Sequence, residues 1–193
     1  MNTVIKSKNI KPAATKKPSP KTPVRKPAAI KDGRLFELEV TIIDGLVTEA
    51  FVKKNPKVSR TIEMRGDQTL EKLHDAIFKA FDRFDPHLYE FQIGGREPMD
   101  PKAKRYVLQG LFKQQGWFGP EEGAEDLCQT RIGDLDLKKG RVFYYWFDFG
   151  DDWWHKIKVV SISEKVEGKG YPKITARTGE SPPQYVDWDE IEN

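Results

Sequence analysis

Residues 144–157 constrain the fold more than any other stretch, because they place two dense aromatic runs on either side of Gly150. Eight of these fourteen residues are apolar or aromatic, and the other six are three aspartates, a histidine, a lysine and Gly150 itself. Successive side chains of a strand point to opposite faces. The segment therefore predicts two paired strands, residues 142–149 and 153–163, in which one aromatic row opposes the other: Tyr145, Phe147 and Trp153 against Tyr144, Trp146 and Trp154.

Two further strands are predicted nearer the start of the chain. Residues 35–43 alternate apolar with polar side chains, the period-two pattern of a half-buried strand, through Phe36, Leu38, Val40 and Ile42. Asp44-Gly45 marks a turn, and after a lysine-rich connection the alternation resumes over residues 58–64. These two segments are predicted to pair as an antiparallel hairpin.

One main helix is predicted to follow, with Asp67 or Thr69 as its N-cap. Its apolar stripe is about four turns long and comprises Leu70, Leu73, Ile77, Phe81 and Phe84. Asp85-Pro86 ends the helix, and residues 87–93 predict another strand.

The remaining segments have weaker patterns. Residues 96–130 predict a long loop or insertion, with a short helix over 106–111, and residues 131–137 predict a connector whose apolar side chains point inward. Residues 168–193 predict an extended strap, frayed at 189–193. The order of elements predicts an α+β domain in which a β-grasp-like mixed sheet packs on one main helix, with a long C-terminal hairpin and strap.

Residues 1–34 differ sharply from the rest of the chain. They hold ten lysines and arginines, five prolines and one acid, with no apolar period that could offset the cost of ordering, so they predict a disordered basic tail. The other 159 residues carry 23 basic and 29 acidic side chains. Five tail cations are suited to weak, nonspecific binding of nucleic-acid phosphates: Lys16, Lys17, Lys21, Arg25 and Lys26. The alternative is a solubilising tail without a partner.

Composition also predicts the compartment. The chain contains no apolar run long enough for a secretory signal or a membrane span, and its single cysteine suits a reducing compartment. We therefore expect a cytoplasmic protein without a membrane partner.

The hairpin offers a candidate pocket with two interpretations. Asp148, Asp151 and His155 could form a metal or acid–base cluster across the turn. In the structural interpretation, which we favour, Asp148 pairs with His155, Gly150 supplies the positive φ of the turn, and Asp151 bonds its own backbone. Trp153 and His155 then share an apolar face. On this interpretation no catalytic residue, metal or cofactor is predicted, and aromatic side chains left exposed would suit a protein partner.

The order and spacing of several short motifs resemble the plasmid pRiA4b ORF-3-like family over residues 35–188. The motifs are Leu73-His74-Asp75-Ala76-Ile77, His87-Leu88-Tyr89-Glu90-Phe91, Ile93-Gly94-Gly95, Ile132-Gly133-Asp134-Leu135, Asp148-Phe149-Gly150-Asp151 with Trp153, His155 and Ile157, Tyr171-Pro172 and Pro182-Pro183. The resemblance implies a β-grasp-like domain of plasmid and transposon passenger genes, without an established activity. At four places this chain differs from the residues that are common in the family: Tyr89, Ser181, Gln184 and Val186-Asp187.

The sequence thus predicts a noncatalytic cytosolic interaction domain, with weak nucleic-acid binding by the tail. The alternative from another class is a metal-assisted hydrolase that uses Asp148, Asp151 and His155.

Overall fold

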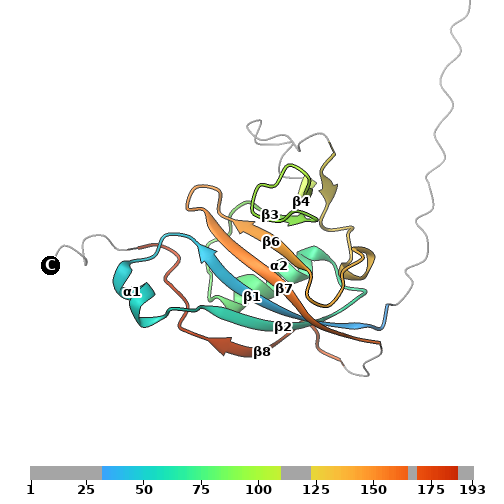
Figure 1. The fold of residues 1–193 in the computed structure, drawn as a ribbon, viewed down its shortest axis with the longest axis horizontal. Coiled ribbons are helices and arrows are strands. Elements are labelled where there is room, and N and C mark those ends of the chain that lie inside the picture. The colour runs from blue at the N-terminus through green and yellow to red at the C-terminus, as the bar shows by residue number, and fades with distance from the viewer. Residues whose placement is uncertain (1–31, 110–122, 165–168, 187–193) are drawn as a thin grey trace, which may run out of the picture.

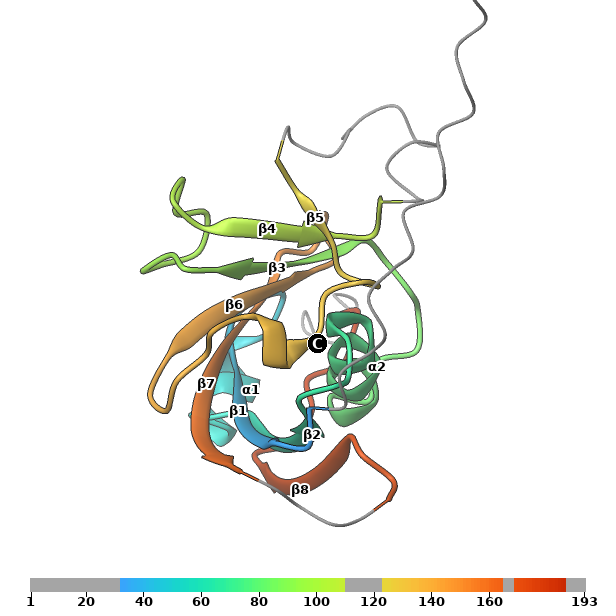
Figure 2. The ribbon, with the colours of Figure 1, turned by 90° about the vertical axis from the view of Figure 1, so that its right-hand side faces the viewer.

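The computed structural model describes residues 32–109, 123–164 and 169–186. Its main feature is one eight-stranded sheet in the order β5-β4-β3-β6-β7-β1-β2-β8, which curves around helix α2 (Figures 1 and 2). The strands are β1 (Leu35–Asp44), β2 (Ser59–Arg65), β3 (Tyr89–Ile93), β4 (Lys104–Val107), β5 (Glu125–Asp126), β6 (Val142–Phe147), β7 (Trp153–Ser163) and β8 (Lys173–Thr178). The predicted α+β class is confirmed.

Strand β1 lies between β7 and β2 and is antiparallel to both. Every sheet pairing is antiparallel apart from the parallel pair β4–β5, so the sheet is mixed. The predicted hairpin of β1 and β2 is confirmed. Its connection contains a short helix that the sequence patterns did not indicate, α1 (Glu49–Lys54), which begins where Thr48 Oγ1 accepts a hydrogen bond from the amide of Phe51.

Helix α2 (Leu70–Ala80) packs its apolar stripe on the concave face of the sheet. Thr69 is its N-cap, as one of the two predicted alternatives, since its hydroxyl accepts from the amide of Lys72. The predicted fourth turn is wrong. Phe81 is the C-cap, Asp82 has a φ of 56°, and Phe84 is 71% exposed. A residue with positive φ cannot continue a right-handed helix, so Phe84 leaves the stripe.

The segment predicted as an insertion contains two strands, β4 and β5. Tyr106 and Val107 belong to β4, so the helix predicted over 106–111 is wrong at its start, and residues 110–122 lie outside the described residues. The connector is confirmed as a 3-10 turn, Ile132–Asp134, with Ile132 and Leu137 buried.

The C-terminal segment forms an edge strand, β8, paired with β2. Residues 181–185 then pack on the loop that follows α2, through hydrogen bonds to Asp82, Phe84 and Asp85. Residues 1–31 and 187–193, which include most of the predicted tail and all of the frayed end, lie outside the described residues. No helix among the described residues is long and apolar enough to cross a membrane.

The last residues of the predicted tail contact the fold. The Asp32 carboxylate pairs with the Arg34 guanidinium at 2.6 Å, and Arg34 also donates to the carbonyl of Gly133 at 2.9 Å. The pKa of Asp32 is lowered, chiefly by the hydrogen bond from the Arg34 guanidinium. The tail therefore joins the domain at residue 32, beside the 3-10 turn.

Candidate functional site

The β6–β7 turn is built differently from the prediction. Asp148 and Asp152 supply the positive φ values, 55° and 52°, and Gly150 does not. The carboxylate of Asp148 accepts from the amides of Gly150 and Asp151, at 3.2 and 3.4 Å, so the side chain that bonds the turn's backbone is Asp148 and not Asp151. Aspartate tolerates this backbone region because its short side chain can bond locally.

The predicted pairing of Asp148 with His155 is wrong. The strand register places His155 opposite Tyr145, on the face toward α2, where it is 1% exposed. Neither ring nitrogen of His155 has a partner at full hydrogen-bond geometry, although the backbone of Trp153 and Tyr145 lies near enough to favour the protonated ring slightly. Burial, with a smaller effect from the charge of Arg83, lowers the pKa of His155 to about 3, so the imidazole is neutral.

Asp148 instead lies near His87, with 3.5 Å between Oδ2 and Nε2. The same His87 nitrogen is 2.9 Å from the Tyr185 hydroxyl, which donates to Asp85 at 2.6 Å. Burial and the charge of Asp148 raise the pKa of Asp151. These groups form a polar cluster at the surface, joining the turn to the C-terminal segment.

The three histidines contact one aromatic cluster: His74 and His155 both lie against Tyr145, and His74 and His87 both lie against Phe147. His74 stacks on Tyr89 at 3.5 Å, and its Nδ1 lies 2.7 Å from the Tyr145 hydroxyl. Burial lowers the pKa of His74 to about 4. Within residues 32–109, 123–164 and 169–186, no group of three or more His, Cys, Asp and Glu side chains is arranged to hold a metal ion. The three residues named for the hydrolase alternative are not brought together, because His155 faces the core whereas Asp148 lies against His87.

Trp153 is fully buried on the core side, as predicted from strand parity. A Cβ built on Gly45 would lie 2.3 Å from its ring, so this glycine is required for the close approach of β1. The opposite aromatic row lies on the outer face, also as predicted: Trp146 stacks on Trp154 at 4.8 Å and contacts Phe149 at 4.1 Å. Trp146 and Phe149 are partly exposed.

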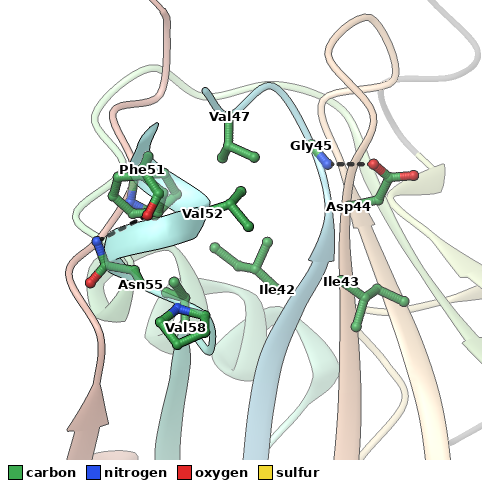
Figure 3. A pocket seen from close by; sticks show the side chains of 11 residues that line it. Ile42, Ile43, Asp44, Gly45, Val47, Phe51, Val52, Asn55 and Val58 are labelled. Carbon is green, nitrogen blue, oxygen red and sulfur yellow. Dashed lines mark hydrogen bonds between the residues drawn. The ribbon is translucent and has the colours of Figure 1, made fainter. Parts of the chain in front are cut away.

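An apolar pocket of about 260 Å³ lies between the end of β1, helix α1 and the start of β2 (Figure 3). Its polar side chains are already bonded to backbone: Asp44 accepts from the amide of Gly45, and Asn55 bonds the amide of Glu180 and the carbonyl of Phe51. Most of the side chains that line the pocket are apolar, among them Ile42, Val47, Phe51, Val52 and Val58.

A larger cleft, of about 540 Å³, lies between the β3–β4 turn and the connector before β6. Four cations line it, against the two carboxylates of Asp134 and Asp136: Lys102, Lys104, Lys138 and Arg141. Lys104 pairs with Glu125 at 3.1 Å. The lining of this basic cleft includes Asp134, next to Gly133. The carbonyl of Gly133 accepts a hydrogen bond from Arg34, at the end of the N-terminal tail.

Sequence reasoning missed Arg83 and named Gln184 only as a departure from the family pattern, yet both side chains lie buried beside the turn. Arg83 is 7% exposed with its guanidinium over the Trp153 ring at 3.8 Å. Gln184 is 3% exposed and bonds the backbone of Phe84 and Asp85. Near Arg83 the sequence shows two charged residues between two phenylalanines, at residues 81–84. This local pattern could not reveal that residues about 100 positions later pack against it.

Known proteins share parts of this chain's sequence. A family model described as plasmid pRiA4b ORF-3-like protein matches residues 50–188, so the match begins within α1. The uncharacterized protein y4hQ of Sinorhizobium fredii is 29% identical over 131 residues, which are 68% of this chain and 60% of that relative. The chain thus spans three fifths of the relative's length.

A solved structure is also similar. The crystal structure of MM3350, a protein of unknown function from Methanosarcina mazei Go1, matches with a TM-score of 0.57 and 23% identity, covering 75% of this chain and 69% of that one. At that identity the likeness shows the fold alone.

Proposed function

The chain belongs to the plasmid pRiA4b ORF-3-like protein family, and we propose that it is a noncatalytic cytoplasmic interaction domain that binds nucleic acid through a basic surface. The proposal includes its origin as a plasmid or transposon passenger. It also retains the β-grasp-like description of the fold, supported by a mixed sheet that curves around one helix.

The observation that carries this proposal is the basic cleft on an acidic body. Residues 35–193 hold six more acids than bases, yet the cleft is lined by four cations and two carboxylates, and one of the cations, Lys104, also pairs with Glu125. A local excess of positive charge on a negative body attracts a polyanion to one place. The cleft is concave, which suits a phosphate backbone better than a flat membrane surface.

The basic tail supports the same function from the sequence side. Lys16, Lys17, Lys21, Arg25 and Lys26 precede the point where the chain enters the fold, and that point is beside the cleft. Tail and cleft can therefore neutralise neighbouring phosphates of one nucleic acid. Tyr106, the aromatic side chain that lines the cleft, is buried, so we expect binding without base stacking and with little sequence preference.

Anisotropy titration of duplex DNA with the full chain at several salt concentrations tests the proposal. Reversal of three cleft cations, Lys102→Glu, Lys138→Glu and Arg141→Glu, is expected to weaken binding and to reduce the salt slope by about 0.9 for each phosphate that the cleft no longer neutralises. The matched control reverses three exposed lysines elsewhere, Lys53→Glu, Lys156→Glu and Lys158→Glu, with the same change of net charge.

A second set of variants tests the tail. Changing its five named cations to glutamine is expected to lower affinity further when combined with the cleft variant. Equal binding by the cleft variant and its control would remove the cleft from the proposal, and no binding by the native chain at low salt would remove nucleic acid altogether.

The outer aromatic row is a second candidate surface, for a protein partner. Trp146 contacts both Phe149 and Trp154 and is partly exposed. Partly exposed aromatic clusters of this kind are typical of surfaces that bind a protein partner. A photo-crosslinker at residue 149 is expected to capture a partner that one at the exposed Lys139 does not capture. Capture that persists after Trp146→Ala would count against this surface.

A further inference from the structure

The buried polar atoms without partners gather in one place. Among the described residues, all five buried side-chain nitrogens or oxygens that lack a hydrogen-bond partner belong to Arg83, Trp153 and His155. Arg83 stacks on Trp153 at 3.8 Å, and its charge contributes to the low pKa of His155, so the three side chains share one neighbourhood. Buried polar groups are nearly always hydrogen-bonded, so this concentration marks a missing partner.

Arg83 defines what that partner must be. Its Nη1 donates to the carbonyl of Pro182 at 3.3 Å, whereas Nε and Nη2 have no acceptor. Those two nitrogens form one edge of the guanidinium, with parallel N–H bonds that match the two oxygens of a carboxylate. The indole N–H of Trp153 is a further unpaired donor.

Other arginines of this chain show how that edge is used. Nε and Nη2 of Arg34 bond the carboxylate of Asp32, at distances from 2.6 to 3.1 Å. The same two nitrogens of Arg65 bond Asp67, both at 3.2 Å, and those of Arg105 bond Glu90. In Arg83 the equivalent edge is buried and carries no oxygen.

The charges around Arg83 limit the charge that an anionic partner can carry. Burial lowers the pKa of Arg83 to about 10, and the negative charges of Asp148 and Asp151 partly oppose that effect without a hydrogen bond to the guanidinium. His155 is neutral. Two carboxylates already lie near this cation, so the repulsion of a second negative charge makes a phosphate dianion less suitable than a monoanion at its unpaired edge.

We propose that the Nε/Nη2 edge of Arg83 binds the carboxylate of a small organic acid, with the Trp153 indole N–H and the neutral His155 as additional polar contacts. The site lies between the loop after α2, strand β7 and residues 182–185. It is separate from the basic cleft, so its test does not depend on nucleic-acid binding.

The experiment uses the full chain, purified without carboxylic acids, and measures thermal unfolding with acetate, butyrate or benzoate added. We expect the acids to raise the Tm, and Arg83→Met to weaken the apparent affinity about tenfold to hundredfold, because two charge-assisted hydrogen bonds are removed. Arg177→Met, which removes an exposed arginine that bonds Ala80, is expected to leave the affinity unchanged.

Further arms separate a carboxylate from other anions. Arg83→Lys keeps the charge but lacks the two-pronged edge, so binding should weaken about tenfold. Chloride or inorganic phosphate with an effect equal to that of acetate would overturn the proposal, as would an effect that survives Arg83→Met. A Tm unchanged by every acid would mean that water or the chain itself satisfies Arg83, and would overturn it too.

Discussion

Arg60 and Arg83 are two buried arginines in the same part of the molecule, and their surroundings differ. Arg60 is 2% exposed and lies over the Phe81 ring at 4.9 Å, much as Arg83 lies over Trp153. Arg60 nitrogens donate to five oxygens, those of Ser59, Ala80, Thr178, Gly179 and Ser181. Arg83 donates to one.

This contrast separates a structural buried cation from one awaiting a ligand. Arg60 ties β2, the end of α2 and the segment after β8 together, so its desolvation is offset by acceptors from three parts of the chain. Arg83 has comparable burial without comparable acceptors. A protein that needed only packing at that position would do better with an apolar side chain.

The largest effect is expected for Arg60→Met. The substitution removes five hydrogen bonds from a charged donor, two of them to the carbonyls of the buried residues Ser59 and Ala80, and a hydrogen bond to a charged group contributes about 1.5–3 kcal/mol. We expect a loss of at least about 3 kcal/mol in the free energy of unfolding, measured by urea denaturation. A loss below about 1 kcal/mol would mean that the network is dispensable and that the two arginines do not differ in role.

Acid should destabilise the protein through its buried histidines. The folded pKa values, about 4 for His74 and about 3 for His155, lie below the ordinary value of about 6.5, so the unfolded chain binds protons that the fold excludes. Their contribution is full above about pH 6.5 and falls as the pH drops, to about pH 4 for His74 and about pH 3 for His155, by up to about 1.4 kcal/mol per pH unit for each histidine.

Arginine variants refine this pH dependence. Burial is the larger cause of the low pKa of His155 and the charge of Arg83 the next, so Arg83→Met should raise that pKa and reduce the loss of stability in acid. Arg60→Met should leave the pKa of His155 and the loss of stability in acid unchanged. Urea midpoints between about pH 4 and pH 7.5 measure both, and equal acid sensitivity in the two variants would contradict the contact inferred for Arg83.

In the absence of a ligand, Arg83→Met should change the free energy of unfolding by about 1 kcal/mol or less, or raise it. Methionine keeps apolar contact with Trp153 and removes a buried charge that lacks acceptors. Chemical denaturation at neutral pH measures this effect. A loss as large as that of Arg60→Met would show Arg83 to be structural.

The smallest effect is expected for Phe84→Ala. Phe84 is 71% exposed, whereas Phe81, which lies under Arg60, is 1% exposed. Removal of the Phe84 ring should change stability by about 0.5 kcal/mol or less, and urea denaturation measures it. A cost near the roughly 3–5 kcal/mol typical of a buried phenylalanine would restore the longer helical stripe that the sequence predicted.

Local patterns explain what the sequence predicted well. Strand parity placed Trp153, His155, Ile157 and Val159 on the buried face, because side-chain alternation depends only on neighbouring residues. The same is true of the N-cap Thr69 and of the opposed aromatic rows. The candidate site fared less well. Parity gave the face of His155 but not its register partner, Tyr145.

The turn shows the same limit. Glycine was expected at the positive φ because it carries no steric penalty there, yet Asp148 and Asp152 adopt it, with the Asp148 side chain bonding the turn's own amides. Which residues of a short loop take that conformation depends on where strand pairing stops, here at Phe147 and Trp153.

The α+β class, the main strands, the main helix and the division between a basic tail and an acidic body all follow from the chain's residues in order, because periodicity and composition are properties of consecutive residues. Which charged side chains are buried, and which of them have partners, depends on tertiary structure. Three of the five acceptors of Arg60, and the one acceptor of Arg83, belong to residues roughly 100 or more positions away. Hydrogen bonds across that separation exist only once the sheet and the C-terminal segment have assembled.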